Sequence, residues 1–198
     1  MRALVVFLLA STGCGSYVGT ARDFSPSILS REHGWIAVRE VSWLAQRDDA
    51  DCGAAAIGMV VAHWTGAEPQ VVADAVRPAG KSGIRADRLR AEARRHGLAA
   101  FLVHGRIADL EHELRRGRPV LVGLVKPHRN DALAHYEVVV AYHPERRVVV
   151  TLDPATGWRQ NSLRGFLAEW KPPGYLALIV APRDHAQIWK IPGGGGKV

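Results

Sequence analysis

Cysteine is scarce in this chain, with two residues, Cys14 and Cys52, among 198. Two cysteines exclude a zinc site built on thiolates alone, and they allow at most one disulfide bond. A chain of this length can bury an apolar core without either kind of cross-link. A disulfide bond between Cys14 and Cys52 remains an alternative, so each cysteine needs its own interpretation.

The apolar run at the N-terminus is short, and Ala3 to Ala10 cannot span a bilayer as a helix. It follows Met1-Arg2 and precedes Ser11-Thr12-Gly13-Cys14, a pattern that resembles the lipobox of bacterial lipoproteins. We predict a signal peptide at 1–13 and a lipidated Cys14, which would anchor an exported protein to the bacterial membrane, facing the periplasm or the cell exterior. Ser11 departs from the usual leucine, so cleavage by ordinary signal peptidase is a second interpretation. An apolar first strand or helix is a third.

A basic run with interleaved aromatic residues is also missing, although the formal net charge is +7 and the isoelectric point is near 9.9. The arginines occur in scattered groups such as Arg94-Arg95 and Arg146-Arg147. Stacking on bases needs aromatic residues near the positive charges, so we do not expect nucleic-acid binding. Anionic lipids and cell-wall polymers remain compatible with the charge.

The order of the expected elements predicts one α+β domain at 35–182. Residues 14–34 are polar and rich in turn residues, which indicates a tether, and 183–198 form a glycine-rich tail. Helices come first and an antiparallel sheet follows. We expect helices at 52–64, 69–76, 85–96, 107–116 and 162–170, and strands at 36–44, 98–103, 119–125, 136–142, 147–152 and 175–181.

Cys52 is expected to begin a buried helix, because Asp51-Cys52-Gly53 separates a polar loop from a run of small apolar residues. Asp51 is then placed to cap the helix. Unpaired amides and the helix dipole favour a thiolate at such a position, and the thiolate is the nucleophilic form of cysteine. The alternative is a buried core cysteine without a chemical role.

A hairpin is expected to bring a histidine and a carboxylate together. If the turn lies at 143–145, Tyr142 pairs with Arg146, and the same register places His135 directly opposite Asp153. With the turn shifted by one residue, Asp153 remains diagonal to His135. His143 is expected in the solvated turn. The alternative for His135 is a histidine at a sheet edge that has no catalytic role.

Gln46 precedes Cys52 on the incoming loop. Its side-chain amide can stabilise the oxygen that becomes negative during nucleophilic attack, together with the backbone N–H of Cys52. An ordinary solvated glutamine is the alternative. His128, Asn130 and Asp131 lie before His135 and are interpreted mainly as a surface loop.

From about Trp43 to Ala181, the chain resembles the double-glycine, bacteriocin-processing peptidases, a family of the papain-like cysteine peptidase superfamily. The resemblance rests on Gln46, Asp51-Cys52-Gly53-Ala54-Ala55, His135 to Val140 and Asp153 to Gly157. It implies a papain-like fold, in which a central catalytic helix packs on an antiparallel sheet. It also implies Cys52 as nucleophile, His135 as base, Asp153 as orienting residue and Gln46 in the oxyanion hole.

The implied function is hydrolysis of peptide bonds in a peptide or protein substrate, with glycine pairs as the suggested cleavage site. This mechanism requires no metal or organic cofactor. Cell-wall amide hydrolysis or transamidation by the same residues is an alternative, and so is a papain-like domain that binds a peptide without cutting it. The sequence does not predict the oligomeric state.

Overall fold

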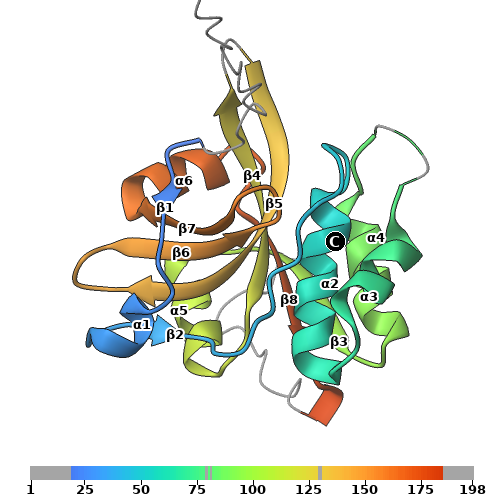
Figure 1. Ribbon diagram of the computed structural model, residues 1–198, viewed down its shortest axis with the longest axis horizontal. Coiled ribbons are helices and arrows are strands. Elements are labelled where there is room, and N and C mark those ends of the chain that lie inside the picture. The colour runs from blue at the N-terminus through green and yellow to red at the C-terminus, as the bar shows by residue number, and fades with distance from the viewer. Residues whose placement is uncertain (1–18, 79, 81, 129–130, 185–198) are drawn as a thin grey trace, which may run out of the picture.

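The computed structural model describes residues 19–78, 80, 82–128 and 131–184. The predicted signal peptide, Cys14, Asn130 and most of the glycine-rich tail lie outside these ranges. The described chain combines helices with one antiparallel sheet, which confirms the α+β prediction (Figure 1). Within it, no helix has both the length and the apolar character needed to cross a membrane.

Eight strands form the sheet, in the order β1-β7-β6-β5-β4-β8-β3, with β2 added to β5. Every pair of neighbouring strands is antiparallel. The long β4–β5 hairpin extends beyond the other strands at the top of Figure 1. The strands are β1 (Arg22–Asp23), β2 (Ile36–Ala37), β3 (Ala99–His104), β4 (Val120–His128), β5 (Asp131–His143), β6 (Val148–Asp153), β7 (Gly157–Ser162) and β8 (Leu176–Ala181).

The predicted central helix is α2 (Cys52–Thr65), and all its residues from Cys52 to Val61 are buried. Small side chains on every face allow close packing against other elements. Gly66 ends the helix with a φ of 69°, a left-handed conformation that glycine adopts without steric cost. Helices α3 (Pro69–Val76) and α4 (Ala86–Arg95) lie beside α2 in Figure 1.

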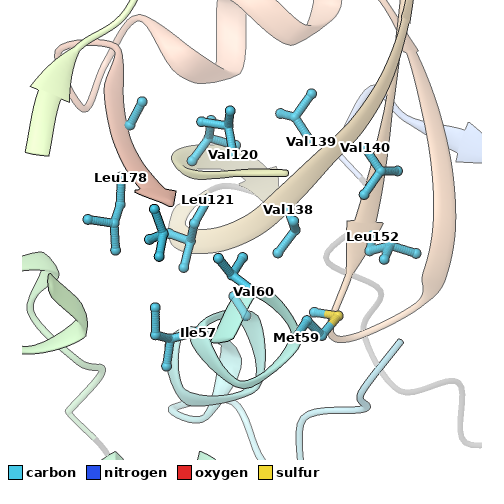
Figure 2. Close-up of a cluster of buried hydrophobic side chains, with 14 of the residues drawn as sticks. Ile57, Met59, Val60, Val120, Leu121, Val138, Val139, Val140, Leu152 and Leu178 are labelled. Carbon is cyan, nitrogen blue, oxygen red and sulfur yellow. The ribbon is translucent and has the colours of Figure 1, made fainter. Parts of the chain in front are cut away.

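The main core lies between α2 and the sheet. Figure 2 shows Ile57 and Val60 of α2 facing Leu121 and Val138 of the sheet, while Met59 points toward the strand that carries Leu152. These side chains are fully or almost fully buried. The contact fixes the direction of α2 relative to β5, and therefore the position of Cys52 relative to this strand.

Helix α6 (Leu163–Trp170) lies on the other side of β4 and β5 from α2 (Figure 1). The Ser162 hydroxyl caps it by accepting a hydrogen bond from the Gly165 N–H at 3.1 Å. Helix α5 (Ile107–Arg115) packs against β2, β4 and β5. Both faces of the central strands are therefore covered, which explains why β4 and β5 are largely apolar.

The segment that the sequence suggested as a tether has regular structure in its described part. It contains β1 and helix α1 (Ile28–Arg31), and β1 pairs with β7. Arg159 of β7 forms an ion pair with Asp23 and donates to the Ala21 carbonyl at 3.0 Å. Residues 19–34 thus pack against the domain.

Candidate active site

Cys52 is the first residue of α2 and carries a free thiol with 5% of its surface exposed. The free N–H groups of the first helical turn and the positive end of the helix dipole favour negative charge at this position. The Cys52 thiol lies close enough to His135 to raise the pKa of the imidazole.

Asp51 does not cap the helix through its side chain, which corrects the sequence expectation. Its carboxylate is 1% exposed and accepts from Arg77 Nε at 2.7 Å and Nη2 at 2.9 Å. It also accepts from the backbone N–H of Arg47 at 3.1 Å. Pairing with Arg77 compensates the cost of burying the carboxylate, so Asp51 instead connects the loop of Gln46 to the start of α2.

His135 lies in β5, is 2% exposed and donates from Nε2 to Asp153 Oδ1 at 2.7 Å. Burial alone would lower its pKa, but the hydrogen bonds to Asp153 and Cys52 and the charges of both groups raise the pKa to about 10. Since Nε2 donates to Asp153, Nδ1 is the ring nitrogen that can exchange a proton with the thiol.

Asp153, the last residue of β6, is fully buried and held by the turn that follows it. Its carboxylate accepts from the Ala155 N–H and from the Thr156 hydroxyl, both at 2.8 Å. Burial favours the neutral acid, but the hydrogen bond and charge of His135 and these two donors lower the pKa of Asp153. The residue is thus an anion aimed at the imidazole.

The predicted hairpin register is wrong, although the contact it was used to predict is present. His143 pairs with Val148, and the turn lies at 144–147 rather than at 143–145. Arg147 adopts a left-handed φ of 54°, which makes the longer turn possible. His143 is therefore not solvated. It is 3% exposed, and its Nε2 lies 3.2 Å from the His33 carbonyl oxygen.

A β-bulge in β5 places His135 and Asp153 on the same face of the sheet. Ala141 pairs with Val150 but Val139 pairs with Thr151, so Val140 is an extra residue in β5. If the strands paired regularly from the observed turn, without this bulge, Asp153 and His135 would lie on opposite faces of the sheet. With the bulge they share a face, and Asp153 reaches His135 diagonally.

Gln46 is held next to this cluster by backbone contacts. Its N–H donates to the Pro154 carbonyl at 2.9 Å, and the Trp43 indole donates to the Asp153 carbonyl at 2.8 Å. The loop carrying Gln46 is thus fixed between the end of β6 and the start of α2. The buried Oε1 of Gln46 has no hydrogen-bond partner among the described residues.

Two further features near the cysteine were not predicted from the sequence. Tyr136 packs on Gly53, where a Cβ atom would lie 3.1 Å from its ring. Burial and the nearby charges of Cys52 and Asp87 raise the pKa of Tyr136 to about 12, so it stays neutral. Trp43 is 44% exposed beside the cluster although it is large and apolar.

Buried charges behind the cluster were also missed. Lys126, Glu137 and Glu169 are each 1% exposed, and Lys126 Nζ lies 2.6 Å from Glu137 Oε1 and 3.0 Å from Glu169 Oε2. The sequence does contain one sign of these buried charges, which is a single charged residue within an apolar strand pattern. Glu137, between Tyr136 and Val138, is such a residue.

One group in this region has donor atoms that could hold a metal ion. Single donor atoms of His135, Glu137 and Asp153 lie within 4.8 Å of one another. Asp153 already accepts from His135, and Glu137 is paired with the ammonium group of Lys126. Their charges are therefore compensated by protein groups, and the arrangement favours proton transfer.

Comparison with known proteins shows the family of the chain. A model of the Peptidase C39 family matches residues 40–185. No protein of curated function matches the chain.

Three of the solved structures that match the chain illustrate the shared fold. The peptidase domain of Streptococcus ComA, a bifunctional ABC transporter, is 23% identical with a TM-score of 0.59, over 73% of this chain and all of that one. A double glycine motif protease from an AMS/PCAT transporter, solved with its leader peptide, is 20% identical with a TM-score of 0.57, over 74% and 94% of the chains. A C39-like peptidase from Bacillus anthracis is 16% identical with a TM-score of 0.59, over 75% and 98%. The chain therefore belongs to the Peptidase C39 family and is a papain-like cysteine peptidase.

Proposed function

We propose that the protein cleaves peptide bonds with Cys52 as the nucleophile, His135 as the general base and acid, and Asp153 as the group that orients His135. The observation that carries this proposal is the buried hydrogen bond from His135 to Asp153, together with the rise in the pKa of His135 that Asp153 and the nearby Cys52 thiol cause. An orienting carboxylate fixes the tautomer of the histidine and stabilises its protonated form.

The proposed reaction has two steps, acylation of Cys52 and hydrolysis of the thioester. The Cys52 thiolate attacks the carbonyl carbon, and the C–N bond breaks as imidazolium His135 gives its proton to the leaving amine. Water then attacks the thioester, His135 accepts a proton from it, and the acid product leaves Cys52. The Gln46 amide and the Cys52 N–H stabilise the oxyanion in both steps.

We also propose that the substrate is a peptide cut after a pair of glycines. The structural neighbour solved with a leader peptide is a double glycine motif protease, and this likeness supports the specificity. The test uses synthetic leader-type peptides with an internal Gly-Gly pair, together with matched peptides in which Ala-Ala replaces it. Cleavage after Gly-Gly by the wild type, and none by Cys52→Ala, is expected. Cleavage that persists in Cys52→Ala would contradict the proposed nucleophile.

Cell-wall amide bonds are the second candidate substrate class, because a net charge of +7 favours anionic polymers. Release of soluble fragments from purified peptidoglycan by the wild type, without cleavage of any Gly-Gly peptide, would favour this class. The same Cys52→Ala variant serves as the control, since the nucleophile is common to both reactions.

The location of the protein outside the cytoplasm is also a proposal, with Cys14 as its lipidated residue. The basic start, the short apolar run and the small residues before Cys14 support it. Radiolabelled palmitate should label the wild type in bacterial cells, and Cys14→Ser should lose both the label and the membrane association. An unlabelled wild-type protein would contradict lipidation.

A further inference from the structure

A buried charge cluster lies behind the proposed active site, and the proposed mechanism does not use it. Lys126 of β4 contacts Glu137 of β5 and Glu169 of α6 at 2.6 and 3.0 Å. The three side chains are at most 2% exposed. A buried lysine with two buried carboxylates is expensive to desolvate, so its presence calls for an explanation beyond stability.

The charge of Lys126 is preserved by its two partners. Burial lowers the pKa of a lysine, but the negative charges of Glu137 and Glu169 and their hydrogen bonds outweigh burial and raise it. The group is therefore a permanent cation enclosed between the sheet and α6.

Glu137 connects this cation to the candidate active site. It is two residues from His135 on β5, and both side chains lie on the same face of the strand. Donor atoms of His135, Glu137 and Asp153 lie within 4.8 Å of one another. A carboxylate so close can compete with Asp153 for the imidazole N–H and can also repel the charge of Asp153.

We propose that Lys126 is a positioning residue, whose ammonium group holds the Glu137 carboxylate so that Asp153, and not Glu137, orients His135. This inference rests on the proposed role of His135. The observation that carries it is the 2.6 Å contact between Lys126 Nζ and Glu137 Oε1, next to the 2.7 Å hydrogen bond from His135 to Asp153. Lys126 acts through Glu137 and does not touch the thiol in this account.

The N-terminal segment completes the cluster. Glu169 Oε1 accepts from the N–H and from the hydroxyl of Thr20, both at 2.6 Å. Gly19 packs so closely that a Cβ atom there would lie 2.5 Å from Glu169 Oε1 and 2.8 Å from Lys126 Cδ. Thr20 thus holds Glu169, and Glu169 in turn holds Lys126 in place.

The titration of His135 in the intact protein is the test, and it requires no substrate. The charged or titratable groups that determine it are Cys52 of α2, Asp153 of β6 and Glu137 of β5, with Lys126 and Glu169 behind them. We would follow the imidazole NMR signal of His135 in protein labelled with ¹³C-histidine, and assign it with His135→Gln.

We expect the pKa of His135 to shift in opposite directions in two single variants, Glu137→Gln and Lys126→Met. Glu137→Gln removes a negative charge and should lower the pKa of His135, while Lys126→Met releases Glu137 toward the imidazole and should raise it. At this separation a charge should shift the pKa by about one unit or more. Lys126→Met/Glu137→Gln has the wild-type net charge, and its His135 pKa should return close to the wild-type value.

Matched controls separate this role from a structural one. Lys171→Met, directly after α6, and Glu145→Gln in the β5–β6 turn change exposed residues of the same types, and neither should move the titration. If Lys126→Met does not fold, Glu137→Gln decides the test, because it keeps the pair between Lys126 and Glu169. An unchanged His135 pKa in Glu137→Gln would overturn the proposal. Equal shifts in one direction from both single variants would also overturn it.

The result of this titration can be told apart from the result of the experiment that tests the proposed function. Loss of peptide cleavage in Cys52→Ala tests the nucleophile, whereas the His135 titration tests only the positioning by Lys126. A protein that cleaves through Cys52 but shows no variant-dependent titration would refute this inference alone.

Discussion

Asp153 shows how single residues set the chemistry of this site. Its carboxylate accepts from His135, from the Ala155 N–H and from the Thr156 hydroxyl, at 2.7 to 2.8 Å. These donors stabilise the anion inside the protein, and the anion stabilises protonated His135. The sequence allowed this pair to be predicted because both residues lie near the same end of a hairpin. It did not reveal Lys126 and Glu137, since a charge within an apolar strand has no visible partner in the sequence.

Asp153→Asn is expected to weaken catalysis and to shift its pH dependence. The amide cannot stabilise the imidazolium, so kcat/KM should fall by about 10²- to 10⁴-fold. The folded-state pKa of His135, about 10 in the wild type, should fall as well. A pH profile of kcat/KM on a Gly-Gly peptide would check both, with the exposed Asp49→Asn as control. Wild-type activity in Asp153→Asn would contradict the proposed role.

The same pKa values define a pH window for stability. The pKa of His135 is raised from 6.5 to about 10, so its stabilising contribution is complete below pH 6.5 and is lost as the pH rises through 10. Asp153 has a lowered pKa, and its contribution is lost only when acid protonates the folded-state carboxylate. Urea unfolding of the wild type and His135→Gln should therefore show a difference that shrinks between pH 6.5 and 10. A difference that grows with pH would contradict this assignment.

At the scale of elements, the β5–β6 hairpin marks the limit of reasoning from sequence. Two runs of β-branched residues predicted two strands and their pairing, but neither the four-residue turn nor the extra residue Val140 follows from the pattern. Each of the two irregularities changes the register, and together they restore the contact between His135 and Asp153. The central helix was predicted to within one residue, because its small apolar composition and Gly66 are both visible in the sequence.

The start of α2 gives a prediction at this scale. Arg77→Met leaves the buried carboxylate of Asp51 without its cation, which should lower the free energy of unfolding by about 2–4 kcal/mol. Arg47→Met is the matched control, because the Arg47 side chain is 53% exposed and its pair with Asp74 lies at the surface. The control should change stability by less than about 0.5 kcal/mol. Chemical denaturation of both variants measures the change in the free energy of unfolding. Equal decreases in the two variants would refute a special role for the Asp51–Arg77 pair.

At the scale of the whole molecule, the domain includes more of the N-terminus than the sequence suggested. The family model begins at residue 40, whereas the structure packs residues 19–34 on β7 and α6. Short polar segments rich in turn residues resemble linkers in composition, and their pairing with distant strands is not encoded locally. Fold class and family, by contrast, could be predicted from the sequence, because they depend on long periodic segments and on the motifs around Cys52 and His135.

A chain that starts at Trp35 should therefore be less stable than one that starts at Gly19. The shorter chain loses β1 and the hydrogen bonds from Thr20 to Glu169. A loss of about 2 kcal/mol corresponds to a decrease in Tm of roughly 4–8 °C for a protein of this size. Thermal unfolding of the two chains, with Thr20→Val as an intermediate case, measures the effect. Equal Tm values would show that this segment does not stabilise the domain.

The central claim is that His135 activates the Cys52 thiol. Its most direct measurement is the rate at which iodoacetamide alkylates Cys52 at pH 6, located by peptide mass mapping, in the wild type and in His135→Gln. Because only the thiolate reacts, the wild type should react at least about 10-fold faster than the variant. Equal rates in the two folded proteins would contradict the account.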